Sequence, residues 1–519
     1  MRFHHKLYIF FILFQFFIVS VYTQTITIGP ENNLKGNETL TEILGQKDGV
    51  IYIHKSKSDI FKTDGEFLEK FNLETLENIG TIPLLLHDAF IEVNKRKLKP
   101  NLETAFIFQN RLHMFLTAYD RIEKKNIAYV GLFDERDFQY ALIEIDAIRN
   151  ATSYDPGAFI FTPNNDGSKL VIVQNIPGIK KGKSLLGLSL FNEKLEKIST
   201  KGIVLPYDRN MIDFEQVISN SKGDIAMLLK VYLTRKEIKP GNEDHIYHLV
   251  TLKHGESEVK DHKILIPNKR VKHVSILFNQ REEIMLLGFI GNELSKGITG
   301  TVYGTFNFDG EQINRLNETL FPSNILQHFT PEKYINRGEG VQGISIDKVF
   351  LKSNGGIYVI SEQYHIERVC NRDARGTLAC NYYYYYNSIL VHSIAENGEY
   401  EWTKLIPKYQ SSIDDGGIYS SYATAFKNDT LFFVFNEHEK NFEQTDPSKL
   451  RVMLRPNKAV LALSIMTPDG NVSKTPLINN KTENNKARPR FYYTDKNAQL
   501  IIPANELQSN KFKLIRIEF

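Results

Sequence analysis

The chain has 519 residues, of which 42% are hydrophobic, 12% aromatic and 24% charged, and this composition excludes a disordered or collagen-like protein. Lysine and arginine number 64 against 61 aspartates and glutamates. This near-neutral balance gives no reason to expect binding to nucleic acid or to an anionic membrane surface. The length would fit three or four ordinary domains, unless internal repeats close into a single ring.

The first predicted element is a secretory signal peptide over residues 1–23. Two basic residues precede an apolar run at residues 7–22, and small polar residues follow it, which is the order found in signal peptides. Cleavage after Thr23 would leave Gln24 as the first residue of the mature chain. An uncleaved anchor is the alternative, but this run is shorter than the roughly 20 residues that a spanning helix needs. No second long apolar run occurs, so we expect no membrane span after cleavage.

Two alternating classes of turn follow the leader, with almost no helical periodicity between them. Eight turns rich in Asn, Asp, Gly and Lys each precede a short apolar strand. These strands begin at Val50, Leu112, Leu170, Ile225, Ile284, Ile357, Leu431 and Leu500. Seven turns of a second class fall between them and begin at Thr63, Asp134, Asn192, Lys253, Asp309, Glu396 and Pro468. We predict repeats of four antiparallel strands A to D, in which the first class joins A to B and the second joins C to D.

These repeats predict an all-β fold, a β-propeller with eight blades. A ring of seven blades is the alternative, because strand A of the first repeat is poorly marked near residues 39–44. The last repeat ends in strand C at Phe519. We expect residues 25–28 to supply its strand D and to close the ring without an exposed edge. Two or three β-sandwiches are the alternative, but no linker divides the chain, so residues 24–519 are expected to form one domain with an insertion at 437–458.

The chain has two cysteines, Cys370 and Cys380, in a predicted hairpin insertion at residues 366–386. In an exported chain such a close pair favours a local disulfide that staples the hairpin. Zinc needs about four ligands, and only His365 lies nearby, so we expect no metal here. We also expect no cofactor, since no phosphate loop or similar motif occurs. The run of tyrosines at 382–386 would place an aromatic face beside the disulfide, either packed on the sheet or forming a recognition patch.

The segment from Gly355 to Asn441 contains GGIYVISEQY, NSILVHSI, NGEYEW, LIPKYQSS and FFVFNEHEKN. In these stretches it resembles uncharacterised exported proteins of Bacteroidetes-type bacteria. The resemblance covers about a sixth of the chain and implies a secreted, periplasmic or envelope protein, without a catalytic motif. A bacterial source would leave the six Asn-x-Ser/Thr triplets unmodified, whereas a eukaryotic secretory pathway would make them glycosylation sites.

A ligand site is expected where the B strands end, because in a propeller the B–C loops and the D–A connections converge on one face. Carboxylates, amides and phenols at these ends suit a hydroxyl-rich or peptidic ligand. The predicted binding residues are Tyr119, Asp120, Glu362, Tyr364, Asn436 and Glu437. Glu362 and Glu437 would also form an acid and base pair if the fold held them within the roughly 5 to 10 Å that glycoside hydrolysis requires. The alternative is that these strand ends are solvated loops.

The sequence therefore predicts an exported, non-catalytic binding protein with a polar and aromatic ligand face. Its partner would be an extracellular or envelope ligand, a glycan or a protein, and we expect the chain to be a monomer. Catalytic residues stay unknown, because no nucleophile elbow and no His-Glu-x-x-His motif occurs. The alternative function is a carbohydrate-active hydrolase or lyase that uses carboxylates on the same face.

Overall fold

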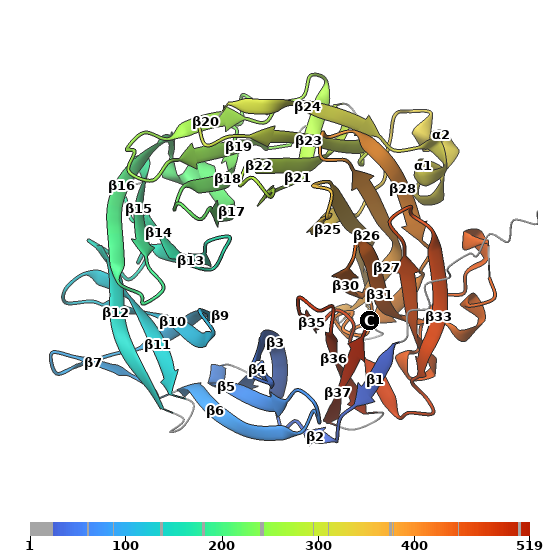
Figure 1. Cartoon of the computed structure of the whole chain (residues 1–519), viewed down its shortest axis with the longest axis horizontal. Helices are drawn as coiled ribbons and strands as arrows, with labels where there is room; N and C mark the ends of the chain where they lie inside the picture. The colour runs from blue at the N-terminus through green and yellow to red at the C-terminus, as the bar shows by residue number, and fades with distance from the viewer. Residues whose placement is uncertain are drawn as a thin grey trace, which may run out of the picture.

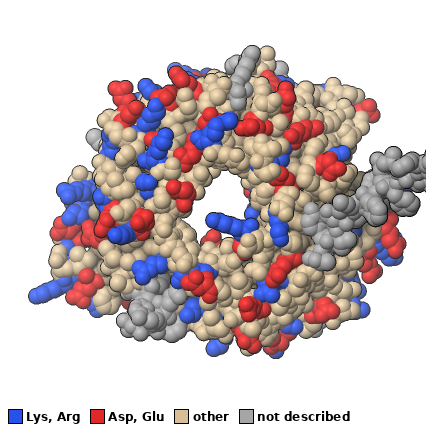
Figure 2. All heavy atoms as spheres, in the orientation of Figure 1, with Lys and Arg blue, Asp and Glu red and all other residues tan. Residues whose placement is uncertain are grey.

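The computed structural model describes residues 24–519 except 60, 61, 87, 135–138, 179–181, 239–242, 294, 310, 373–375, 377, 445 and 507–509. The predicted signal peptide lies outside the described residues. The chain is all-β, and its sheets stand side by side around a central opening as in a β-propeller (Figure 1). Figure 2 shows that this opening persists when all side chains are drawn, and that acidic and basic residues are interspersed over this face.

The described residues form eight sheets of four to six antiparallel strands and one two-stranded ribbon. The first sheet holds β3 (Glu38–Lys47), β4 (Val50–Asp59), β5 (Lys62–Asn72) and β6 (Asn78–Leu86). The ribbon of β7 (Ile91–Val93) and β8 (Arg96–Leu98) precedes the second sheet, which holds β9 (Pro100–Phe108), β10 (Arg111–Asp120), β11 (Lys125–Asp134) and β12 (Gln139–Arg149). The third sheet holds β13 (Ala158–Pro163), β14 (Leu170–Ile176), β15 (Lys183–Phe191) and β16 (Lys197–Asp208). After η1 (Arg209–Met211), the fourth holds β17 (Ile212–Ser219), β18 (Ile225–Tyr232), β19 (His245–Leu252) and β20 (Lys260–Lys263).

The fifth sheet holds β21 (Lys269–Phe278), β22 (Ile284–Asn292), β23 (Gly300–Phe306) and β24 (Gln312–Leu320), and is followed by α1 (Ser323–Phe329) and α2 (Glu332–Ile335). The sixth holds β25 (Ile344–Leu351), β26 (Ile357–Arg372), β27 (Leu378–Ile394), β28 (Tyr400–Ile406) and β29 (Gln410–Ile413). The seventh holds β30 (Ala423–Lys427), β31 (Thr430–Glu437), β32 (Val460–Met466) and β33 (Val472–Asn479), with η2 (Glu439–Asn441), η3 (Pro447–Lys449) and η4 (Pro456–Lys458) between β31 and β32. The eighth holds β34 (Asn485–Ala487), β35 (Tyr493–Thr494), β36 (Leu500–Glu506), β37 (Lys511–Glu518), β1 (Thr25–Ile28) and β2 (Asn32–Asn33).

The turn classes read from the sequence account for most of this order. All eight turns of the first class join an innermost strand to the next one, and the second-class turns that begin at Asn192, Lys253, Glu396 and Pro468 join a third strand to a fourth. The turns predicted at Asp134 and Asp309 include residues outside the described part of the chain. The remaining prediction is wrong, because the turn signal at Thr63 lies within β5. The turn after β5 is instead made by Asn72, whose Oδ1 accepts hydrogen bonds from the backbone N–H groups of Glu74 (2.8 Å) and Thr75 (2.9 Å). A side-chain-made turn of this kind needs no glycine.

The first and last described strands meet in the eighth sheet. β1 pairs antiparallel with β37, from Thr25 opposite Glu518 to Ile28 opposite Ile515. Ile26 packs against the buried apolar cluster of this sheet and its neighbour. The outer edge of the eighth sheet is therefore formed by the beginning of the chain, whereas the other sheets take their outer strand from the end of their own repeat.

The core lies between the faces of adjacent sheets. The second strands β22 and β31 are buried along nearly their whole length, which fits their unbroken apolar sequences. Ile360 and Val391 of the sixth sheet, for example, pack against Phe433 and Phe435 of the seventh. The outer strands β16 and β33 have many exposed residues, so the ring is held together by contacts between sheet faces nearer its centre.

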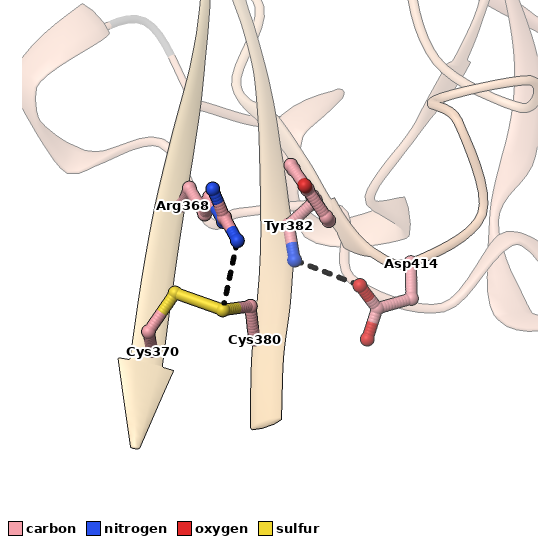
Figure 3. The surroundings of a disulfide bond; sticks show 5 residues. All are labelled: Arg368, Cys370, Cys380, Tyr382 and Asp414. Carbon is pink, nitrogen blue, oxygen red and sulfur yellow. Dashed lines mark hydrogen bonds between the residues drawn. A yellow bond between two sulfur atoms is a disulfide. The ribbon is translucent and has the colours of Figure 1, made fainter. Parts of the chain in front are cut away.

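The insertions occur at three places. The predicted hairpin at 366–386 is present as an extension of β26 and β27, and Cys370 lies opposite Cys380 and forms the predicted disulfide (Figure 3). Residues 437–458 carry η2, η3 and η4, as an insertion in the seventh sheet. The third insertion, α1 and α2, is absent from the sequence-based prediction. It explains the long spacing of 73 residues between Ile284 and Ile357.

Candidate functional site

The six predicted site residues lie on three second strands, at the ends of β10 and β31 and in the middle of β26, and do not form one surface. Tyr119 and Asp120 end β10, across the ring from β26 and β31, which carry the other four (Figure 1). Asp120 is 1% exposed, and its Oδ1 accepts hydrogen bonds from Arg96 (2.9 Å) and from two backbone N–H groups of the following turn. The Tyr119 hydroxyl donates to a backbone carbonyl at 3.3 Å. These contacts hold the β10–β11 turn in place.

Glu362 is enclosed rather than presented to solvent. Its carboxylate forms an ion pair with Lys408, and both side chains are buried. The Ser421 hydroxyl donates to Glu362 Oε2 at 2.6 Å. Lys408 Nζ also donates to Gln410 Oε1 at 2.9 Å, and burial lowers the pKa of this lysine. The pair therefore fastens the connection at 407–422 to the middle of β26.

Asn436 and Glu437 are likewise completely buried. Asn436 Nδ2 donates to two backbone carbonyls at 2.8 Å, and its Oδ1 accepts from Asn480 at 2.9 Å. Glu437 accepts from Lys474 at 2.9 Å and from Asn441 at 2.8 Å. Glu362 and Glu437 each have their own lysine inside the protein, so this placement gives no support to an acid and base pair that acts on a bound sugar.

Tyr364 differs from these buried neighbours because it lines a cavity. Its ring packs against the ring of Tyr386, with 4.6 Å between their centroids. The cavity has a volume of about 460 Å³ and lies between the inner strands β21 and β25 and the loop after β22. The Tyr386 hydroxyl accepts a hydrogen bond from Arg490 at 2.8 Å. Arg490 lies between β34 and β35 of the eighth sheet, so this connection also holds the aromatic pair in place.

A second cavity of about 690 Å³ adjoins the first, beside the segment that carries α1 and α2. Lys296 and Gln342 line both cavities, which therefore meet at these two residues. We call the joined cavities the interblade groove, and define it by residues 295–298, 329–345 and Tyr364. The groove lies where a B–C loop of the fifth sheet meets the D–A connection into the sixth, which is the face on which the sequence placed a ligand site.

Glycine permits the close backbone approach that forms the floor of the groove. Ile298 and Val341 exchange two backbone hydrogen bonds of 2.8 Å. A Cβ on Gly297 would lie 2.3 Å from the carbonyl oxygen of Gly340, and one on Gly340 would lie 2.1 Å from that of Ile298. Only glycine fits at such positions. The glycine-rich stretches GNELSKGITG and RGEGVQGIS are the sequence signal by which this site could have been found.

The charged side chains of the groove are mainly basic. Lys296 and Arg337 are exposed, and in the part of the chain that the structure describes neither forms an ion pair with a carboxylate. Lys272 lines the cavity beside Tyr364 and is paired with Glu243 at 2.6 Å. Glu339 is the acidic residue among those that line the second cavity. The groove therefore presents two cations whose charge no described protein group neutralises by direct contact.

His273, which lines the same cavity, adds little positive charge to it. Burial away from water, and then the positive charges of Lys272 and Lys230, lower the pKa of His273 from its ordinary value. Its imidazole is therefore mainly neutral at pH 7. The positive character of the groove therefore depends on its lysine and arginine side chains.

Asp347 lies beside the groove on the inner strand β25, at a bulge between Ile346 and Lys348. Its side chain retains access to solvent, and it accepts hydrogen bonds from the hydroxyls of Tyr422 (3.0 Å) and Ser345 (3.3 Å). Loss of surrounding water, and then the charge of Glu362, raise the pKa of Asp347 to about 7. This carboxyl group therefore changes its charge near neutral pH.

Two further properties bear on the kind of site. None of the helices in the described residues is long and apolar enough to cross a membrane. Within the same part of the chain, His, Cys, Asp and Glu side chains form no group of three or more that could hold a metal ion.

No protein-family model matches the chain, and no curated protein matches its sequence. Among solved structures, a protein of unknown function from Bacteroides caccae aligns at 13% identity over 66% of this chain and 90% of that one, with a TM-score of 0.28. The β-propeller domain of the Trilobed protease from Pyrococcus furiosus aligns at 11% identity over 86% and 97% of the two chains, with a TM-score of 0.36. Polysaccharide lyase Uly1 aligns at 11% identity over 92% and 89%, with a TM-score of 0.39. At these values the similarities assign neither a family nor an activity.

Proposed function

We propose that this chain is an exported binding protein, with a cleaved signal peptide at residues 1–23 and a single eight-bladed β-propeller domain at residues 24–519. The eight sheets of the described residues and the pairing of β1 with β37 support a ring closed by its N-terminal strand. The disulfide fits a secreted or periplasmic location. Mass analysis of the exported protein should find Gln24 as the first residue, and a chain that retains Met1 would contradict cleavage.

The ligand that we propose is a hydroxyl-rich molecule, a glycan, held in the interblade groove. The observation that carries this proposal is a cavity lined by Tyr364 that continues into a second one lined by Gln342 and Gln363. Amide side chains supply donors and acceptors for sugar hydroxyls, and an aromatic ring supplies an apolar contact. Both cavity volumes fall within the roughly 300 to 1,000 Å³ typical of ligand sites. The buried Lys408, which pairs with Glu362, donates a hydrogen bond to the backbone carbonyl of Tyr386, and the ring of Tyr386 packs against Tyr364.

Calorimetric titration with oligosaccharides selected on a glycan array tests this function. Tyr364→Ala should weaken binding about tenfold or more, as expected when an aromatic anchor is lost. Tyr154→Ala is the matched control, because Tyr154 is 98% exposed and is not among the groove residues; it should bind like the wild type. An array without any bound glycan would refute the proposed ligand class, and unchanged binding by the Tyr364 variant would refute the site.

Asp347 favours a second candidate function, a carbohydrate-active hydrolase or lyase. A carboxyl group with a pKa of about 7 and access to solvent holds and releases a proton at neutral pH, as a general acid or base must. The Tyr422 hydroxyl fixes its orientation. Mass spectrometry of bound oligosaccharides after incubation should then show cleavage products, which Asp347→Asn should abolish without loss of binding. If the oligosaccharides stay intact, the hydrolase or lyase function is excluded and the binding function stands.

A further inference from the structure

The two exposed cations of the interblade groove differ from the cations that pair with the carboxylates of the second strands. Lys408, Lys474 and Arg96 each contact a buried carboxylate of the protein. Lys296 and Arg337 have no such carboxylate among the described residues, although both line a cavity. A positive charge inside a concave wall is less screened than one on a convex surface and favours a negative partner. Glu362 is the counter-ion of Lys408, whereas the counter-ion of each groove cation would be supplied by a ligand.

The placement of these cations fits a chain-like ligand. Lys296 stands where the two cavities meet, and Arg337 lies within the larger one. A ligand that runs from Tyr364 toward the α1–α2 segment therefore passes Lys296 before it reaches Arg337. Two cations in succession along one path match a polymer that carries an anionic group on several of its units.

The neutral lining narrows the class of polymer. The exposed Gln342 supplies an uncharged amide donor and acceptor, while Tyr334 and Phe329 supply aromatic surface. The neutral side chains of Gln363 and Thr330 also line this cavity and are held by hydrogen bonds within the protein. Such a lining matches the hydroxyls and apolar faces of sugar rings. Over the whole chain the net charge is only +3, so the attraction to an anion must be local to the groove.

We propose that the interblade groove binds an acidic oligosaccharide, with Lys296 and Arg337 each contacting a carboxylate or sulfate group of the sugar chain. This inference rests on the proposed glycan-binding function and adds the charge class of the ligand and the two residues that select it. Charge-assisted contacts of this kind are also sensitive to salt, so binding must weaken as ionic strength rises.

Calorimetric titration with paired probes tests the inference. The acidic probes are hexamers of galacturonate and mannuronate and a sulfated galactan hexamer, and the neutral probes are their methyl-esterified or desulfated forms. At least one acidic probe should bind about tenfold more tightly than its neutral form, consistent with the loss of charged hydrogen bonds. Lys296→Gln and Arg337→Gln should each remove about tenfold of that affinity and flatten its salt dependence. Lys263→Gln, an exposed lysine on the outer strand β20, should change neither.

The possible outcomes separate this inference from the function on which it rests. Equal affinity for acidic and neutral forms would overturn the charge selection while glycan binding stood. If no glycan bound, acidic or neutral, both proposals would fall. Tight binding of a hexaglutamate peptide, matching that of the acidic sugars, would show recognition of charge alone and overturn the assignment to glycans. The unfolding temperature of each variant is the control for folding. A value equal to that of the wild type shows that a loss of binding is not caused by a loss of folding.

Discussion

At the scale of single residues, the buried carboxylates of the second strands act as internal anchors. Glu362 has 4% of its surface exposed and has Lys408 as its counter-ion. Removal of one member leaves the other as an unpaired charge inside the protein, which is far more costly than removal of both. The energetic role of such a pair is therefore visible only when its partners are changed one at a time and then together.

Lys408→Met should lower the free energy of unfolding by about 3 to 5 kcal/mol, because Glu362 then stays buried without a counter-ion. Urea unfolding measures this loss. The double variant Lys408→Met with Glu362→Gln should recover most of it, since no charge is left unpaired. Lys449→Met removes an exposed lysine, 70% accessible, from a surface pair with Asp446 and should cost less than about 1 kcal/mol. A loss as small as this in the Lys408 variant would show that the buried pair does not anchor the strand.

Asp347 predicts a pH dependence of stability with a definite sign. Its pKa is about 7 in the folded protein and about 3.9 in an unfolded chain, so the folded state favours the protonated form. The stability that this residue contributes is present below about pH 4 and is lost as the pH rises toward 7. The difference in unfolding temperature between wild type and Asp347→Asn should therefore shift in favour of the variant between pH 4 and 7, and level off above pH 8. A constant difference over this range would contradict the raised pKa.

The burial of these residues could not be derived from the sequence. Glu362 and Asn436 each follow an apolar run in the sequence, and such a position predicts a polar strand end that faces solvent. What encloses Glu362 is Lys408, 46 positions later in a segment without any periodic pattern. Tyr364 has the same kind of position, and the structure places it on a cavity wall because the connection at 338–343 passes beside it without covering it. The choice between an enclosed and an open strand end depends on connections whose path local sequence does not specify.

At the scale of elements, strands were predictable where a turn carries its own chemical signal. Turns with Gly, Asn or Asp mark nearly every junction between first and second strands, because these residues adopt left-handed backbone conformations easily. The α1–α2 segment was missed because both helices are short, 7 and 4 residues, and so show no helical repeat. The groove beside that segment was missed with it, although the glycines that form its floor were visible in the sequence.

The hairpin of β26 and β27 is held at its base independently of its disulfide. β29 pairs with β27 from Tyr383 to Tyr386, and the backbone N–H of Tyr382 donates to Asp414 at 2.7 Å (Figure 3). The disulfide lies beyond these contacts, where Arg368 donates to Cys380 Sγ at 3.2 Å. It therefore stabilises the end of the hairpin rather than the ring.

Replacement of both cysteines by serine should leave the unfolding temperature of the ring within about 2 °C of wild type, because the stapled segment is exposed and opens locally. Trypsin should cut the variant faster after Arg368 or Arg372, by about tenfold, as expected for an unstapled exposed loop. Limited proteolysis followed by mass spectrometry measures both the site and the rate. A large drop in unfolding temperature would instead show that the hairpin folds as one unit with the ring, and unchanged cleavage would show that β29 alone holds it closed.

At the scale of the whole molecule, the two ends of the chain share one sheet. This arrangement leaves the outer edge of β37 covered by β1 rather than open to another chain. The sequence predicts it from two observations, a final repeat in which only three strands are marked and an alternating TITI segment just after the predicted signal peptide. The pairing also makes the N-terminal segment part of the eighth sheet, so its hydrogen bonds with β37 contribute to the stability of that sheet.

A cross-link between the chain ends tests this pairing. Thr25→Cys with Glu518→Cys should form a disulfide on mild oxidation, because directly opposed residues of antiparallel strands lie about 4.5 to 5.5 Å apart at Cα. The cross-link should raise the unfolding temperature by several degrees by blocking separation of the ends, and reduction should reverse the rise. Thr25→Cys with Lys511→Cys, displaced seven positions along β37, should stay unlinked. A linked peptide from one chain, found in a monomeric band, supports closure of the ring within a monomer, whereas a disulfide-linked dimer would show that β1 completes the sheet of a second copy.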